Sequence, residues 1–386
     1  MPEYLSPGVS VEEIEIGAKP IEGVGTCTAG FVGMAEKGNR DKPTLVTNWA
    51  QFVATFGRYT DEKPYLAPAV FGFFANGGSR CYIVRVADSA TDGDYVGTDG
   101  GPENRTGLQA FNELDEVTIV CIPGVTSETV QSAMITHCES QKDRFCILDT
   151  AEDADLDAVQ DQRDNVVSER GYAALYYPWI RVAVETLDAT SGKIKLKEKF
   201  VPPSGYVAGV FARNDTERGV HKAPANEIVR GALELKVAIT KGEQDILNLK
   251  GINGIRAFPG RGIRVWGART TASDNLWRYV NVRRLFLYLE KSIEEGTRWV
   301  VFEPNDEKLW VLVRQSVSEF LTRVWRDGAL MGMSPEEAFF VKCDRTTMTQ
   351  NDIDTGKLFC VIGVAPVKPA EFVIFRIAQW TAGAKL

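Results

Sequence analysis

The sequence predicts a mixed α/β protein with a mostly parallel sheet in its middle part and extended strands at both ends. Between residues 117 and 177, short apolar runs alternate with helical segments. Between 282 and 328, large apolar side chains recur at helical spacing, and both chain ends are rich in β-prone residues. Strands that alternate with helices favour parallel pairing with helices on both faces of the sheet.

Residues 1–22 predict an extended arm. Pro7-Gly8 is typical of a turn, and the following run alternates apolar and polar side chains, with a change of face at Glu12-Glu13 that indicates a bulge or twist. An amphipathic terminal strand needs a partner sheet, either its own domain or another copy of the chain. The apolar members of this run are Val9, Val11, Ile14 and Ile16.

Residues 23–88 predict the N-terminal part of the core, with helices over 49–56 and 65–76 and a strand over 80–86. Residues 88–107 are rich in Asp, Gly and Thr, which indicates a loop or a domain junction.

Residues 89–260 predict an α/β domain. Its expected strands cover 117–122, 145–148 and 173–177, with helices over 127–140 and 155–170. A hairpin is expected to join residues 180–186 to 194–200.

Residues 261–370 predict a C-terminal α+β domain, with a helix over 282–295, a strand over 299–302 and a second helix from 304 to Gly328. The second helix is amphipathic. Its apolar face carries Trp310, Val313, Val317, Phe320, Leu321 and Val324, and its polar face carries Lys308, Gln315, Glu319, Arg323 and Arg326.

Residues 371–386 predict a C-terminal β-arm. An almost wholly apolar strand at a chain end promotes aggregation unless another strand pairs with it. The residues expected to make this pairing are Phe372, Val373, Ile374, Phe375 and Ile377.

Catalytic motifs do not form a coherent set, so we expect no catalytic residues and no enzyme activity. The glycine spacing of residues 33–39 lacks the Lys and Ser/Thr of a phosphate loop, and the dinucleotide fingerprint that begins at Gly23 has Thr28 at its third glycine position. His137 and His221 have no carboxylate or nucleophile at a recognised spacing, and Asp149 is expected to cap a strand.

Composition excludes several binding functions. The seven cysteines are scattered without a CxxC pair, which argues against a metal site and favours free buried thiols in a reducing compartment. The net charge of −8 disfavours nucleic-acid binding. No apolar stretch approaches the roughly 20 residues that cross a bilayer, and no signal peptide is visible. We therefore expect no cofactor, no nucleic-acid partner and no membrane insertion.

A series of ordered motifs spans both ends and most of the second half of the chain. The chain resembles the contractile tail sheath family of phages and extracellular injection particles. The segments that carry this resemblance are Ser6-Pro7-Gly8-Val9, Tyr177-Pro178-Trp179, Val201-Pro202-Pro203-Ser204-Gly205, Ala208-Gly209-Val210-Phe211-Ala212-Arg213, Lys222-Ala223-Pro224-Ala225-Asn226, Trp266-Gly267-Ala268-Arg269-Thr270, Arg278-Tyr279-Val280-Asn281-Val282-Arg283-Arg284, Glu303-Pro304-Asn305 and Pro366-Val367-Lys368-Pro369-Ala370-Glu371-Phe372.

The resemblance implies a subtilisin-like middle domain without catalytic residues and subunits that polymerise into a helical contractile tube around an inner tube. It also implies that terminal arms complete sheets in neighbouring subunits, and that baseplate and terminator or cap proteins are partners. Assembly is then expected in the bacterial cytoplasm, within a phage tail or an injection particle that is released from the cell. The expected hinges are Gly17, Gly23, Pro366 and Pro369.

The inner tube is expected to bind exposed charge, because contraction must release it. Our candidate is Lys308, Arg323 and Arg326; a solvated helix face is the alternative. The cluster Arg278, Arg283 and Arg284 is a second candidate, and it equally suits pairing with acids of its own domain. Two other functions stay open: a non-contracting baseplate or adaptor protein, and an α/β enzyme.

Overall fold

The computed structural model describes residues 19–187, 193–372 and 374. The chain divides into two compact units, with breaks after Gly23, Lys291 and Ala365. We call residues 24–291 with 366–386 the sheet unit, and residues 1–23 with 292–365 the hairpin unit.

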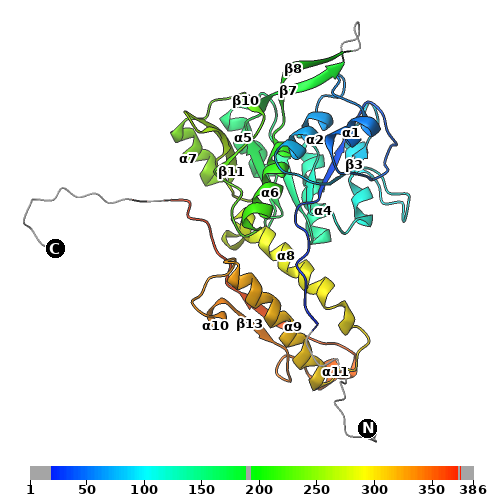
Figure 1. The fold of residues 1–386 in the computed structure, drawn as a ribbon, viewed down its shortest axis with the longest axis vertical. Helices are drawn as coiled ribbons and strands as arrows, with labels where there is room; N and C mark the ends of the chain where they lie inside the picture. Colours follow the sequence, from blue (N-terminus) through cyan, green and yellow to red (C-terminus); the bar gives the residue numbers. More distant parts are fainter. Residues whose placement is uncertain (1–18, 188–192, 373, 375–386) are drawn as a thin grey trace, which may run out of the picture. The chain divides into compact units, whose positions relative to one another are not determined.

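A nine-stranded sheet forms the centre of the sheet unit (Figure 1). The six central strands, from β3 to β11, pair in parallel, and antiparallel strands flank them at both edges. The strand order is β2 (Thr44–Val46), β3 (Cys81–Arg85), β1 (Ala29–Gly33), β4 (Ile119–Cys121), β5 (Phe145–Asp149), β6 (Ala173–Tyr177), β11 (Ile252–Phe258), β12 (Gly262–Val265) and β9 (Glu227–Ile228).

Every residue of β1, β4, β5 and β6 is buried, which explains why these strands are continuous apolar runs without alternation. The helices of this unit are α1 (Trp49–Phe56), α2 (Leu66–Ala75), α3 (Asp92–Val96), α4 (Glu128–Gln141), α5 (Leu156–Asn165), α6 (Ser204–Arg218), α7 (Lys241–Lys250) and α8 (Val280–Gly296), with short 3-10 turns at Gly107–Glu113 and Asn275–Trp277. Helix α8 continues to Gly296, beyond the break after Lys291.

Helices cover both faces of the sheet. The ring of Phe145 on β5 lies 6.3 Å from that of Phe211 on α6, whereas the next residue, Cys146, shares a hydrogen bond with Cys138 on α4. Neighbouring residues of a strand point to opposite faces, so α6 and α4 lie on opposite sides.

Two glycines allow α6 to lie very close to α2. A Cβ atom on Gly205 would lie 2.4 Å from the carbonyl oxygen of Ala69, and one on Gly209 would lie 2.5 Å from that of Phe73. Nearly all of α6 is buried, so it lacks the amphipathic pattern by which a surface helix is recognised.

A second, three-stranded antiparallel sheet orders β10 (Ala232–Leu235), β7 (Ile180–Leu187) and β8 (Ile194–Val201). The predicted hairpin is therefore confirmed, although the connection over 188–192 lies outside the described residues.

The hairpin unit is built around the long helix α9 (Glu307–Arg326), whose first turn is capped by Asp306 at 2.9 Å from the Leu309 amide. The predicted apolar face of α9 is buried. A two-stranded antiparallel sheet pairs β13 (Phe339–Lys342) with β14 (Val361–Val364). The shorter elements are α10 (Pro335–Ala338), α11 (Gln350–Asp354) and a 3-10 turn at Arg298–Val300.

Three sequence predictions need correction. The strand expected over 299–302 is wrong, because the chain turns after α8 and leaves Val301 and Phe302 exposed without a pairing strand. The helix expected over 155–170 ends at Asn165, since Ser168 pairs with Ala272 in a β-bridge. Residues 88–107 are mainly loop, but they include α3.

The other helices and strands predicted between residues 49 and 328 are confirmed, with ends that agree within a few residues. The strands predicted at the two chain ends stay a prediction, because most of their residues lie outside the described part of the chain. The proposed domain boundaries at residues 22, 88, 260 and 370 stay a prediction.

A buried ion pair joins three segments of the sheet unit. Arg284 on α8 donates to both oxygens of Asp215 on α6, at 2.9 and 2.6 Å, and to the carbonyl of Thr26 at 3.0 Å. The Thr26 hydroxyl donates to the same carboxylate at 2.6 Å. Both charged side chains are at most 4% exposed, so each charge depends on the other for its stabilisation.

Substitution of Asp215 by Asn should lower the free energy of unfolding by about 3–5 kcal/mol, because it leaves the Arg284 charge buried and unpaired. Urea unfolding of the full chain measures this. Asp164→Asn is the control, since it breaks the exposed pair with Lys250 and should cost no more than about 1 kcal/mol. Equal losses in the free energy of unfolding of the two variants would contradict the conclusion that burial makes the Arg284–Asp215 pair important.

Candidate assembly surfaces

The residues that most resemble a catalytic group are an aspartate and a serine at the edge of the sheet. Asp149, at the end of β5, accepts hydrogen bonds from the Ser204 amide at 2.9 Å, the Ser204 hydroxyl at 2.6 Å and the Gly124 amide at 3.2 Å. Burial raises the pKa of Asp149 to about 6, although these hydrogen bonds oppose the shift. The aspartate therefore fixes the start of α6 and the loop after β4.

No histidine contacts this pair within the described part of the chain. His137 on α4 is buried beside Arg144, with Nε2 3.3 Å from the guanidinium. Burial and then the Arg144 charge lower the pKa of His137 to about 4, so it is neutral at pH 7. Because the Ser204 hydroxyl donates a hydrogen bond to Asp149 and contacts no imidazole base among the described residues, the geometry does not activate it as a nucleophile.

The described residues contain no cluster of three His, Cys, Asp or Glu side chains with the arrangement of a metal site. Within the same residues, no helix has both the length and the apolar character needed to span a membrane.

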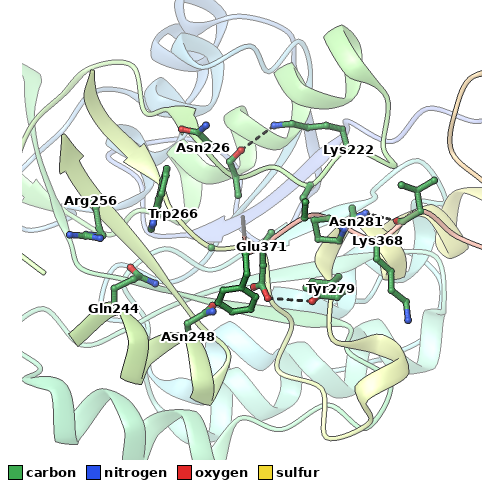
Figure 2. A pocket seen from close by; sticks show the side chains of 18 of the residues that line it. Lys222, Asn226, Gln244, Asn248, Arg256, Trp266, Tyr279, Asn281, Lys368 and Glu371 are labelled. Carbon is green, nitrogen blue, oxygen red and sulfur yellow. Dashed lines mark hydrogen bonds between the residues drawn. The ribbon is translucent and has the colours of Figure 1, made fainter. Parts of the chain in front are cut away.

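The C-terminal segment 366–372 is anchored to the sheet unit by a partly buried ion pair. The guanidinium of Arg269 donates to both oxygens of Glu371, at 2.8 and 2.6 Å. The Tyr279 hydroxyl lies 3.3 Å from the same carboxylate, a contact that Figure 2 shows. Asn281 donates to the carbonyl of Val367 at 3.2 Å. We call this segment the strap.

The strap forms one wall of an open groove of about 970 Å³. Gln244 and Asn281 line it, and each is buried with a side-chain oxygen that has no hydrogen-bond partner among the described residues. Figure 2 shows Trp266, Lys222 and Arg256 around the same space. Sequence patterns did not identify the strap anchors, because Arg269 and Glu371 lie 102 residues apart in the chain.

The predicted C-terminal arm begins where the strap ends. Phe372 and Ile374 are 71% and 79% exposed, and neither they nor Glu371 lie in a strand of this chain. Val373, Phe375 and Ile377 lie outside the described residues.

The predicted N-terminal arm leads into a buried anchor of the hairpin unit. Ile21 is fully buried, and its carbonyl accepts a hydrogen bond from Arg323. Its side chain packs directly on Gly296, where an added Cβ atom would lie only 2.6 Å from the Ile21 side chain. Lys19 lies 5.0 Å over the Trp299 ring. The predicted pairing residues Val9, Val11, Ile14 and Ile16, and the hinge Gly17, lie outside the described residues.

The predicted basic face of α9 is exposed. Lys308 and Arg326 reach solvent, and neither makes a hydrogen bond or ion pair with any described residue. Arg323 differs, because its guanidinium also binds the Ile21 carbonyl.

The second arginine cluster is not a surface, which corrects that alternative. Arg283 and Arg284 are 2% and 4% exposed. Arg283 lies 4.3 Å over Trp277 and pairs with Glu290 at 3.1 Å, whereas Arg284 pairs with Asp215. Arg278 donates to Asn275. Arg283 and Arg284 therefore serve the interior of the sheet unit, whereas the contact of Arg278 with Asn275 is exposed.

The sheet of β13 and β14 has open edges. Their register pairs Phe339 with Val364 and Lys342 with Val361. Among the described residues, no third strand joins either edge. Phe340 and Val361 are about half exposed, at 57% and 47%, so the sheet presents apolar side chains as well as free backbone groups.

Substitution of Glu371 by Gln should release the strap, because it removes the carboxylate that pairs with Arg269. Amide hydrogen exchange of residues 367–372 should accelerate by about tenfold or more. The control is Glu62→Gln, an exposed carboxylate. Unchanged exchange in the Glu371 variant would show that the ion pair does not hold the strap.

Lowering the pH should also release the strap, because protonation of Glu371 removes the charge that pairs with Arg269. Burial alone would raise the pKa of Glu371, but the hydrogen bond and charge of Arg269 bring it below its usual 4.5. The anchor therefore contributes its full stability above pH 4.5 and loses it as the pH falls through the lower, folded-state pKa.

Comparisons with known proteins identify the family to which the chain is similar. The family model for the phage tail sheath protein central domain matches residues 90–271, and that for the phage tail sheath C-terminal domain matches residues 272–379. A sheath complex of an extracellular contractile injection system, PVC, in its contracted state is 30% identical, with a TM-score of 0.79 over 98% of this chain and 99% of that chain. A chain of the baseplate of the anti-feeding prophage is 31% identical, with a TM-score of 0.75 over 98% and 100%.

Curated relatives differ in length. A putative prophage major tail sheath protein of Pseudomonas aeruginosa is 24% identical over 97% of both chains. The match to the tail sheath protein of Vibrio phage KVP40 is 29% identical, but it covers 49% of this chain and 28% of that protein. The two family matches adjoin at residue 271, and the structural likeness extends over nearly the whole chain. This chain belongs to the contractile tail sheath family.

Proposed function

We propose that the chain is the sheath subunit of a contractile particle, which polymerises into a helical tube around an inner tube and drives its ejection on contraction. The observation that carries this proposal is the match, over nearly the full length of both chains, to a sheath in its contracted state. Baseplate and terminator or cap proteins complete the proposed partners. Neither nucleic acid nor membrane insertion enters the mechanism.

Assembly is proposed to take place in the bacterial cytoplasm. All seven cysteines are free, and five are buried, which suits folding in a reducing compartment. The assembled particle, a phage tail or an injection particle, then acts outside the cell that made it.

The middle part of the chain is proposed to be a subtilisin-like domain that lacks a catalytic set. Parallel pairing from β3 to β11 and helices on both faces support this assignment. Asp149 and Ser204 contact each other at the edge of the sheet, but their hydrogen bonds serve the start of α6.

The terminal arms are proposed to link neighbouring subunits by strand addition. The open edges of β13 and β14 supply acceptors, and exposed Phe372 and Ile374 supply apolar side chains that a single copy leaves in water. Their burial contributes about 1.5–3 kcal/mol each, before the cost of ordering. A head-to-tail contact that does not close on itself generates a filament.

Contraction is proposed to change the packing of whole units while the arms stay linked. Two of the three breaks between the compact units fall next to proposed hinges, Gly23 and Pro366, and the third follows Lys291 within α8. Pro369 lies within the strap, and Gly17 lies in the N-terminal arm. The extended state must be metastable, so a kinetic barrier holds it until it is triggered, and no nucleotide is required.

A baseplate or adaptor role is the second candidate, because a baseplate chain of the anti-feeding prophage has the same fold over its full length. Long tubes formed by the purified protein favour the sheath role.

Removal of residues 1–16 or 372–386 should abolish tubes and leave a folded monomer, as seen by negative-stain microscopy and gel filtration. A milder test replaces both Phe372 and Ile374 by Asp, which should also prevent tubes because charges would enter the shared sheet. Leu249→Asp is the matched control, since Leu249 is 83% exposed on α7 and outside the arms. Normal tubes from the truncated proteins would refute strand addition.

The inner-tube contact is proposed to lie on the basic face of α9, at Lys308, Arg323 and Arg326. The double charge reversal Lys308→Glu with Arg326→Glu should reduce sheath assembly on a co-expressed inner tube severalfold, and the loss should be smaller at high salt. Arg323 is left intact because it also anchors Ile21.

Sedimentation of assembled sheaths measures this effect. The control reverses two exposed lysines of the sheet unit, Lys37 and Lys42, which should leave assembly unchanged. Full assembly by the α9 variant would identify its basic residues as a solvated face.

A further inference from the structure

Two cysteines face each other at the end of the β13–β14 hairpin from which the connecting segment leaves. Cys343 directly follows β13, and Cys360 directly precedes β14. The register pairs Lys342 with Val361, so one further step places Cys343 opposite Cys360. Beyond this step, the Thr347 hydroxyl donates to the Phe359 carbonyl at 3.0 Å, which keeps the two chain segments together.

This placement meets the geometric need of a disulfide. Opposed residues of antiparallel strands have Cα atoms about 4.5–5.5 Å apart. Disulfides span Cα separations of about 4.4–6.8 Å. The two side chains also share a hydrogen bond, so both sulfur atoms point into the same space. A bond between them requires little movement of the backbone.

The two thiols differ in reactivity. Cys360 is partly exposed, whereas Cys343 is 1% exposed. Their mutual hydrogen bond lowers the pKa of Cys360 and raises that of Cys343. A thiolate that solvent reaches is the form that oxidants attack, so Cys360 is the first to react and Cys343 is the resolving thiol.

An approach to the pair exists on the hairpin unit. Cys343 borders an open pocket of about 340 Å³. Two basic residues, Arg314 and Arg345, and two acidic residues, Glu307 and Asp344, also line this pocket, so its charges largely balance.

We propose that Cys343 and Cys360 are a redox modification site, at which a hydroperoxide converts the two thiols into an intramolecular disulfide. The Cys360 thiolate attacks the peroxide, the O–O bond breaks, and Cys360 becomes a sulfenic acid. The Cys343 sulfur then attacks the Cys360 sulfur, the S–O bond breaks, and the S–S bond forms. For hydrogen peroxide, two thiols and one peroxide give one disulfide and two waters.

A second pair of thiols shows that closeness of two cysteines alone is not sufficient for oxidation to a disulfide. Cys138 and Cys146 also share a hydrogen bond, but both are 0% exposed in the core of the sheet unit. Burial raises the pKa of Cys146 and excludes the oxidant. The folded protein should therefore oxidise the hairpin pair and spare the core pair.

The disulfide would close the segment 344–359, which carries α11, and so restrict opening of the hairpin. Its role rests on the proposed function: subunits assemble with reduced, adaptable hairpins, and the bond fixes the arm-accepting sheet once the particle meets an oxidising exterior. The chemistry itself is independent of tube formation.

The test treats the folded full-length chain with dilute hydrogen peroxide, alkylates the remaining thiols, and maps the peptides by mass spectrometry. We expect a Cys343–Cys360 peptide pair lighter by two hydrogen atoms, with Cys138 and Cys146 alkylated only after denaturation. Amide exchange in 344–359 should slow by about tenfold or more and recover on reduction.

Matched variants complete the experiment. Cys360→Ser should abolish the cross-link, whereas Cys27→Ser removes a partly exposed thiol of the other unit and should leave it intact. If peroxide leaves both Cys343 and Cys360 free to alkylation, or if hairpin exchange is the same in the oxidised and reduced chains, the proposal is overturned. Because the readout is chemical, its failure is distinguishable from a failure to form tubes.

Discussion

The fold of the sheet unit depends on the buried contact between Arg284 and Asp215. It joins α8 to α6 and, through Thr26, fixes the chain just before β1. Two charges at most 4% exposed are stable only because they compensate each other and have further hydrogen-bond partners. The helix that leads into the hairpin unit and the first strand of the sheet are therefore tied to the same point on α6.

Local patterns in the sequence were sufficient where burial leaves a clear signature. The apolar face of α9 predicted this helix correctly, and the apolar runs of β5 and β6 predicted these strands correctly. Local patterns did not predict α6, because this helix is buried on nearly all sides and contains glycines that its close approach to α2 requires. They also failed at residues 299–302, where apolar residues suggest a strand but lack a neighbour to pair with. A strand forms only where a second segment supplies backbone hydrogen bonds, and the sequence of one segment does not show whether such a partner exists.

For the candidate surfaces as well, local residue spacing predicts exposure but not contacts between distant parts of the chain. The exposure of Lys308 and Arg326 follows from helical spacing, and spacing predicted it. The burial of Arg284 does not follow from spacing, because it depends on Asp215, which lies 69 residues away in the chain. The pairing of Arg269 with Glu371 joins residues 102 positions apart, so the strap was invisible to any local pattern.

Both predicted arms emerge next to an anchor that the chain itself provides. Ile21 and Arg323 hold the N-terminal side in the hairpin unit, and Glu371 and Arg269 hold the C-terminal side in the sheet unit. An arm that starts from a fixed point loses less conformational entropy when it pairs with another copy than one that starts from a flexible tail. Because the anchors belong to different compact units, the proposed contraction can reorient one arm relative to the other while both anchors stay intact. On the proposed arm mechanism, the same chain would keep its links to neighbours in two different packings, as contraction of a sheath requires.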